Sequence, residues 1–254
     1  MKEKLYTIPL NDAVNAEDEC PFCFIERKLE QDLLDFVLGS SSSYMESDIR
    51  EKTDEAGFCR IHMKKMFDYG NTLGNSLILK THYEKIRKEM KDQMGAHAGG
   101  GRSRKGLFEK IRPSSQKDPL SVWCEKRDHS CYICQNLDET FQRYIDTFFY
   151  VYEKDEEFRR KIFQGKGFCL HHFGILTDAA SRHLNQKQYE EFCRETFRLM
   201  DENLARVQED ITWLIDKFDY RNKDADWKTS KDALQRGMQK LRGGYPADPV
   251  YKQK

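Results

Sequence analysis

Cysteine and histidine residues fall into four short motifs whose spacing is typical of metal ligands. Two motifs have the form C-x2-C and two have the form C-x2-H, and the two kinds alternate along the chain. Three thiolates and one imidazole complete the tetrahedral shell of a structural zinc ion. The eight candidate ligands are Cys20, Cys23, Cys59, His62, Cys131, Cys134, Cys169 and His172.

The order of the motifs indicates an internal duplication. The C-x2-C and C-x2-H motifs are separated by 35 residues in the first half and by 34 residues in the second. A gap of this length has room for one helix that leads away from the first motif and one that returns to it. We therefore expect the two motifs of each half to bind the same ion. The predicted cofactor is zinc, two ions, one per repeat. The first ion is predicted to bind Cys20, Cys23, Cys59 and His62, and the second Cys131, Cys134, Cys169 and His172.

Other thiols and imidazoles lie near these motifs. His171 and His172 compete for one place, and alignment of Gly57-Phe58-Cys59 with Gly167-Phe168-Cys169 selects His172. A sharper hypothesis adds ligands near the metals. Its candidates, as further ligands or as residues that support a ligand, are His82, His171 and Cys193. Cys124 and Cys193 are otherwise expected to be ordinary thiols.

Other chemistry remains open at the same residues. C-x2-C is also the spacing of a thiol-disulfide oxidoreductase, but the residues before Cys20 are polar and acidic and predict no strand for its βαβ frame. Iron would also accept these ligands, although a histidine at the fourth position favours zinc. Four filled positions disfavour catalysis by the metal. A redox or metal-dependent enzyme is therefore the alternative to a binding or scaffold protein.

The elements around the motifs are predicted to be helices. Apolar residues recur every three or four positions after Cys23, after His62, after Cys134 and after His172. The longest such pattern runs over 189–218 and predicts a C-terminal helix, followed by a short terminal helix that ends at Gly243. Residues 5–10 contain Pro9 and predict an extended segment, either an edge strand or an arm on the surface. The expected fold class is all-α, with two homologous helical units.

Composition limits the classes of function. The chain has 254 residues, 38% of them hydrophobic, and its formal net charge is zero. No global field therefore favours nucleic acid or an acidic membrane. No apolar run reaches the ~18 residues of a membrane span, so we expect a cytoplasmic protein whose thiols stay reduced.

The pattern divides the chain into four segments. We expect a first repeat over 1–94, a flexible basic linker over 95–119, a second repeat over 120–220 and a C-terminal helix and tail over 221–254. The linker is rich in glycine, lysine and arginine but lacks the spacing of a phosphate-binding loop. Nucleic-acid binding through Arg102 to Lys117 is a weaker alternative to a solvated connection.

Several motifs together resemble an uncharacterised family of bacterial proteins found mostly in anaerobic Firmicutes. The matching stretches are 8–13, 19–23, 44–46, 57–62, 73–74 and 81–82. The resemblance covers nearly the whole chain and implies a bacterial cytosolic protein with paired metal sites. The second half has Tyr132 where the first has Pro21. We expect a zinc-stabilised scaffold that uses a helical surface to bind a protein partner or a second copy of itself.

Overall fold

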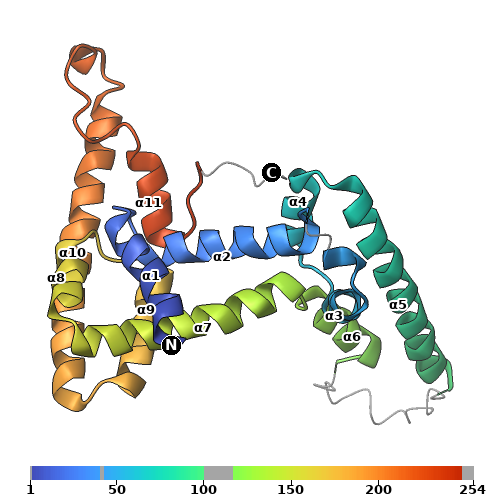
Figure 1. The fold of residues 1–254 in the computed structure, drawn as a ribbon. Helices are drawn as coiled ribbons and strands as arrows, with labels where there is room; N and C mark the ends of the chain where they lie inside the picture. The colour runs from blue at the N-terminus through green and yellow to red at the C-terminus, as the bar shows by residue number, and fades with distance from the viewer. Residues whose placement is uncertain (1, 41–42, 100–116, 248–254) are drawn as a thin grey trace, which may run out of the picture. The chain divides into compact units, whose positions relative to one another are not determined.

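The computed structural model describes residues 2–40, 43–99 and 117–247, and these residues form helices and no strand. The all-α prediction is confirmed. Figure 1 shows the helices in chain order. They are α1 Lys2–Asn15, α2 Pro21–Leu38, α3 Ser47–Ala56, α4 Arg60–Tyr69, α5 Thr72–Gly99, α6 Pro119–Asp128, α7 Tyr132–Lys154, α8 Glu156–Gln164, α9 Leu170–His183, α10 Gln186–Asp216 and α11 Ala233–Arg242.

The chain folds into two compact units that do not coincide with the segments expected from the sequence. The first unit contains Met1–Glu30 and Leu137–Pro249, and the second contains Gln31–Asn136. The boundaries fall inside α2 and inside α7. Each unit is therefore assembled from both halves of the chain, and the expected units 1–94 and 120–220 are not the compact ones.

The first unit has an aromatic core. Phe22, Phe148 and Phe192 are buried to within 1% exposure, and Phe148 makes edge contacts with both of the other rings. Around this core α10 packs against α8, α9 and α11. A capping box at Asn185 and Gln188 begins α10, whose 31 residues confirm the long helix predicted from the apolar pattern.

The second unit has a smaller core of mainly aliphatic side chains, which also contains Phe58, Tyr69 and Tyr132. Leu34, Val37 and Leu38 from the end of α2 pack there with Ile133 from the start of α7. α3 and α4 pack against α5. Arg127 attaches α6 to α5, since its Nε donates to Glu89 at 2.9 Å. The end of α2, from the first half of the chain, and the start of α7, from the second half, thus contribute to one core.

Two local expectations were wrong. Residues 5–10 belong to α1 rather than to an extended arm, although Pro9 lies inside the helix. Proline costs a helix one hydrogen bond, but Leu10 and Ala13 bury one face of α1 in the first core, which outweighs that loss. α5 continues to Gly99, past the expected start of the linker at 95, and the remaining linker residues 100–116 lie outside the described residues.

Candidate metal centres

All four motifs share one local design. A cysteine stands immediately before a helix, as Cys20 does before α2, Cys59 before α4, Cys131 before α7 and Cys169 before α9. The second ligand of each motif lies three residues later, in the first turn of the helix. Exposed N–H groups at a helix start favour negative charge, so each motif presents sulfur where thiolate is stabilised.

The first centre brings the starts of α2 and α9 together. Nδ1 of His172 lies 3.4 Å from Sγ of Cys20, 3.5 Å from Sγ of Cys23 and 3.2 Å from Sγ of Cys169. The sulfurs of Cys23 and Cys169 are 3.6 Å apart. All four side chains are buried. We call this group of four residues the first centre.

The second centre brings the starts of α4 and α7 together. Nδ1 of His62 lies 3.3 Å from Sγ of Cys59, 3.3 Å from Sγ of Cys131 and 3.4 Å from Sγ of Cys134. The sulfurs of Cys59 and Cys134 are 3.9 Å apart. His62 and Cys131 are buried, whereas Cys59 and Cys134 are half-buried. We call this group of four residues the second centre.

These distances match the edges expected of a tetrahedral zinc shell. Zn–S bonds of about 2.3 Å and Zn–N bonds of about 2.0 Å place two sulfurs about 3.8 Å apart and a sulfur and a nitrogen about 3.5 Å apart. The structure gives 3.6 and 3.9 Å between sulfurs and 3.2–3.5 Å between sulfur and nitrogen. No two of the chain's cysteines are joined as a disulfide. Both donor sets therefore fit a four-coordinate metal.

The predicted ligands meet, but their pairing within each half was wrong. Cys20 and Cys23 converge with Cys169 and His172, and the Cys59 motif converges with the Cys131 motif. The C-x2-C motif of each half is thus completed by the C-x2-H motif of the other. Both groups still contain three cysteines and one histidine.

Helix lengths explain the crossed pairing. α2 has 18 residues and rises about 27 Å from its ligands, whereas the helix that follows, α3, has 10. α7 has 23 residues and is followed by α8 with 9. In both cases the outward helix is much longer than the next one. The chain therefore does not return to the motif where it started.

The thiols and the imidazole of the first centre lie so close together that they compete for protons, and a bound cation would remove this competition. The pKa of Cys169 is lowered because the thiols of Cys20 and Cys23 donate to it, and that of Cys23 is raised by the same contact. Burial lowers the pKa of His172, but the contacts with Cys169 and Cys20 dominate and raise it to about 10. A divalent cation bound by these atoms would stabilise all three thiolates at once.

The second centre shows the same competition. Burial raises the pKa of Cys131, but the hydrogen bond from His62 and those from the backbone of Cys134 and Cys59 together outweigh burial and lower the pKa to about 6. The pKa of Cys134 is raised by burial and by the neighbouring charge of Cys131. At neutral pH this centre therefore already favours one thiolate.

A buried lysine joins the two ligand loops of the first centre. Nζ of Lys240, on α11, donates to the carbonyl of Glu19 at 2.5 Å and to the carbonyl of Lys166, and it lies 3.2 Å from the Glu19 carboxylate. Glu19 precedes Cys20, and Lys166 lies three residues before Cys169. Burial lowers the pKa of Lys240. One ammonium group thus holds both loops.

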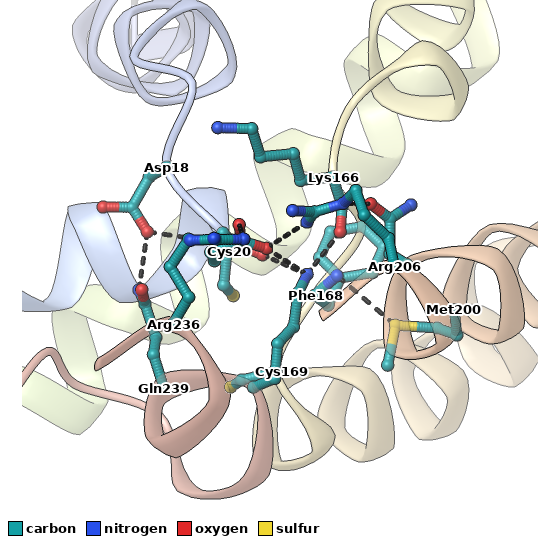
Figure 2. Close-up of polar contacts among 12 residues, drawn as sticks. Asp18, Cys20, Lys166, Phe168, Cys169, Met200, Arg206, Arg236 and Gln239 are labelled. Carbon is teal, nitrogen blue, oxygen red and sulfur yellow. Dashed lines mark hydrogen bonds and ion pairs between the residues drawn. The ribbon is translucent and has the colours of Figure 1, made fainter. Parts of the chain in front are cut away.

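Further contacts from α10 and α11 surround this lysine. Figure 2 shows Asp18, Cys20, Lys166 and Cys169 with residues of the two helices gathered around them. Nε2 of Gln239 donates to Asp18 at 2.6 Å, and Arg206 pairs with Glu19 at the same distance. Glu19 is therefore a buried carboxylate with several cationic partners.

The end of α11 lies on the sulfurs of the first centre. Gly243 follows α11 with φ of 78°, and a Cβ there would lie 3.5 Å from Sγ of Cys169 and 3.6 Å from Sγ of Cys23. The apolar pattern had predicted α11 and its terminal glycine, but nothing in the sequence indicated that Lys240 or Gly243 reaches the ligands. Their contact partners are more than 70 residues away, so no local signal could have revealed them.

The second centre is held by the backbone instead. The N–H of Tyr132 donates to the carbonyl of Gly57 at 2.9 Å, which ties the Cys131 loop to the Cys59 loop. Pro21 occupies the corresponding position of the first centre and has no N–H to donate. Gly57 has φ of 64°, and a Cβ there would lie 2.9 Å from the His82 ring. Glycine is thus required by the backbone and by His82.

The suggested additional ligands do not join either group of four. Nδ1 of His82 lies 3.0 Å from the carbonyl of Asp54. Cys193 is partly buried against the first core, as expected of an ordinary thiol, and Cys124 is exposed on α6. His171 is exposed and lies with Glu26 beside His172.

Comparison with known proteins gives a family and no activity. The model of a family of unknown function (DUF6062) matches residues 1–248. No curated protein and no solved structure matches the chain. Within the described ranges, no helix combines the length and the apolar character needed to cross a membrane. The chain belongs to this family of unknown function.

Proposed function

We propose that the chain binds two structural zinc ions, one in each centre, and acts as a zinc-stabilised helical scaffold that binds another protein. The observation that carries the proposal is the donor geometry. In both centres the separations of sulfur and nitrogen match the edges of a zinc tetrahedron, although the two centres are built from different helices. Each ion would join the starts of two helices from opposite halves of the chain.

A structural role is favoured by the complete donor sets. Three sulfurs and one nitrogen fill all four positions of a tetrahedral shell, so no position is left for water or substrate. Imidazole as the fourth ligand favours zinc over a cluster bound by four thiolates. Binding of each ion would close a loop between segments more than 60 residues apart, which stabilises the folded state.

Elemental analysis tests this proposal. We expect two zinc ions per chain in protein purified under reducing conditions without added metal, and a lower melting temperature after chelation. Restoring zinc is expected to restore the melting temperature. Bound iron with visible charge-transfer absorbance, or a metal-free protein with unchanged stability, would contradict the proposal that the centres bind zinc.

The proposed contact surface lies at the end of the long helix. Ile215 and Phe218 are exposed by 64% and 86%, and Tyr220 follows with 85%. Nζ of Lys217 donates to three carbonyls of the loop that follows α10, including that of Ala225 at 2.6 Å, and these hydrogen bonds order the loop. Light scattering of the native chain and of the Phe218→Ser variant tests whether the chain associates with itself through this surface. A pull-down with the same two proteins as bait tests whether the surface binds a different protein.

The second centre favours one alternative, a thiol-redox enzyme. Cys59 and Cys134 are half-buried, and their sulfurs are 3.9 Å apart. Hydrogen bonds from His62 and the backbone outweigh burial and lower the pKa of the Cys131 thiol to about 6. Reversible formation of a disulfide without unfolding, together with reduction of a disulfide substrate, would favour the enzyme. Zinc-protected thiols without such turnover would favour the scaffold.

A further inference from the structure

The imidazole of His172 has one nitrogen whose role is not explained by the metal centre. Nδ1 faces the three sulfurs, and the ring is enclosed by Phe141 and Phe22, with centroids 5.1 and 5.9 Å away. Only 1% of the residue is exposed. Nε2 makes no hydrogen bond within the described part of the chain. A buried polar nitrogen without a partner destabilises the folded state, so an acceptor is expected beside it.

Glu26 is the carboxylate beside that nitrogen. Its Oε2 lies 3.7 Å from Nε2 of His172. Glu26 lies on α2 three residues after Cys23, so the helix that supplies two sulfurs also places the carboxylate. A shift of the Glu26 carboxylate by about 0.7 Å would bring Oε2 within hydrogen-bonding distance of Nε2. The side chain has room for this change, since 32% of it is exposed.

We propose that Glu26 is a positioning residue of the first centre, which accepts a hydrogen bond from Nε2–H of His172 when Nδ1 binds the metal. This inference rests on the proposed binding of zinc. The hydrogen bond would fix the tautomer with the proton on Nε2, hold the ring in its plane and make Nδ1 a stronger donor. Removing such a contact weakens metal affinity by about 10–100-fold.

The second half of the chain lacks this residue. Glu26 lies three residues after the second cysteine of its motif, and Leu137 occupies that position after Cys134. The hydrogen bond therefore distinguishes the first centre from the second. Glu26→Leu copies the residue of the second half and Glu26→Gln keeps an acceptor oxygen. Glu30→Gln, a change of charge one turn further along α2, is the matched control.

The test is a zinc titration of the full chain against a competing chelator, with the step of the first centre assigned through its loss in Cys23→Ser. We expect Glu26→Leu to weaken that step by about 10–100-fold and Glu26→Gln to weaken it less. Glu30→Gln and the step of the second centre stay unchanged. NMR of protein labelled with ¹⁵N at histidine supplies an independent readout, since the Nε2 proton of His172 should move upfield in Glu26→Leu.

Two results would overturn the proposal while leaving zinc binding intact. One is a wild-type protein with two zinc ions whose affinities and His172 resonance do not change in Glu26→Leu. The other is a third bound metal per chain that both Glu26→Gln and His171→Gln abolish, because Glu26 would then be a ligand. A wild-type protein without zinc would instead refute the proposed function itself.

Discussion

The two centres have the same donors but different surroundings. The first centre is buried at all four ligands, while the second leaves Cys59 and Cys134 half-buried. The first is covered by α11, whose terminal Gly243 lies on two of its sulfurs. The second has no such cover from the described residues, and its loops are joined by the backbone hydrogen bond from Tyr132 to Gly57.

One residue difference accounts for part of this contrast. Pro21 cannot donate the backbone hydrogen bond that Tyr132 donates in the second centre. Lys240 ties the first pair of loops instead, although it lies 221 residues from Glu19 in sequence. Identical ligand motifs therefore do not give identical sites. We expect the element that joins the loops, rather than the donor set, to set how tightly each metal is enclosed.

The largest effect is expected when a ligand is removed. Cys23→Ser and Cys134→Ser should each reduce the metal content by one ion per chain. Cys23→Ser should lower the free energy of unfolding by at least about 4 kcal/mol, because its ligands are fully buried. Cys134→Ser should cost less, since water can reach the half-buried position. Equal losses in denaturant titrations would contradict the contrast between the centres.

Removal of the buried lysine is expected to have the next largest effect. Lys240→Met leaves the carbonyls of Glu19 and Lys166 without this donor, and we expect a loss of about 2–4 kcal/mol with faster release of the first metal. Lys217→Met is the matched control, because Lys217 likewise donates to backbone carbonyls, three in its case, and none of them belongs to a loop that carries a ligand. Release of the first metal at an equal rate in both variants would show that Lys240 does not hold that centre.

Metal transfer to a chromogenic chelator should occur in two phases in the native protein. We expect the second centre to release its metal at least about tenfold faster, since a half-buried site needs less local opening. The fast phase should be absent from Cys134→Ser and the slow phase from Cys23→Ser. A single phase in the wild type, or the opposite assignment, would show that burial does not control the rate.

The smallest effect is expected on the free energy of unfolding at alkaline pH. Burial lowers the pKa of Lys240 in the folded protein below its unfolded value of about 10.4. Between the two pKa values the unfolded state binds more protons, so the free energy of unfolding should rise with pH in that window. Compared with Lys240→Met, the wild type should gain stability across that window. Denaturant titrations of both proteins at several pH values measure this difference. A free energy of unfolding that falls with pH in the wild type relative to Lys240→Met would contradict the prediction.

Much of the local structure could be predicted because the relevant signals are local. Apolar periodicity gave the helices after each motif, and the cysteine and histidine spacing gave all eight residues that converge. α1 was missed because Pro9 suggested extended structure, whereas burial of Leu10 and Ala13 stabilises the helix. Tertiary packing outweighed the local preference there.

The pairing of motifs could not be predicted, because each C-x2-C motif is chemically able to pair with either C-x2-H motif. Non-local features accompany the crossed arrangement, among them the long α2 and α7, each followed by a shorter helix. The role of Lys240 is similarly non-local. A lysine on an amphipathic helix is ordinarily solvated, and its burial depends on two loops from distant parts of the chain.

Metal counting in two double variants tests the crossed pairing most directly. Cys23→Ser with Cys169→Ser alters one centre, so native mass spectrometry should find one zinc ion per chain, held by the second centre. Cys23→Ser with Cys59→Ser alters both centres, and the chain should retain none. Pairing within each half predicts the opposite, with no zinc in the first double variant and one ion in the second, and that result would contradict the account.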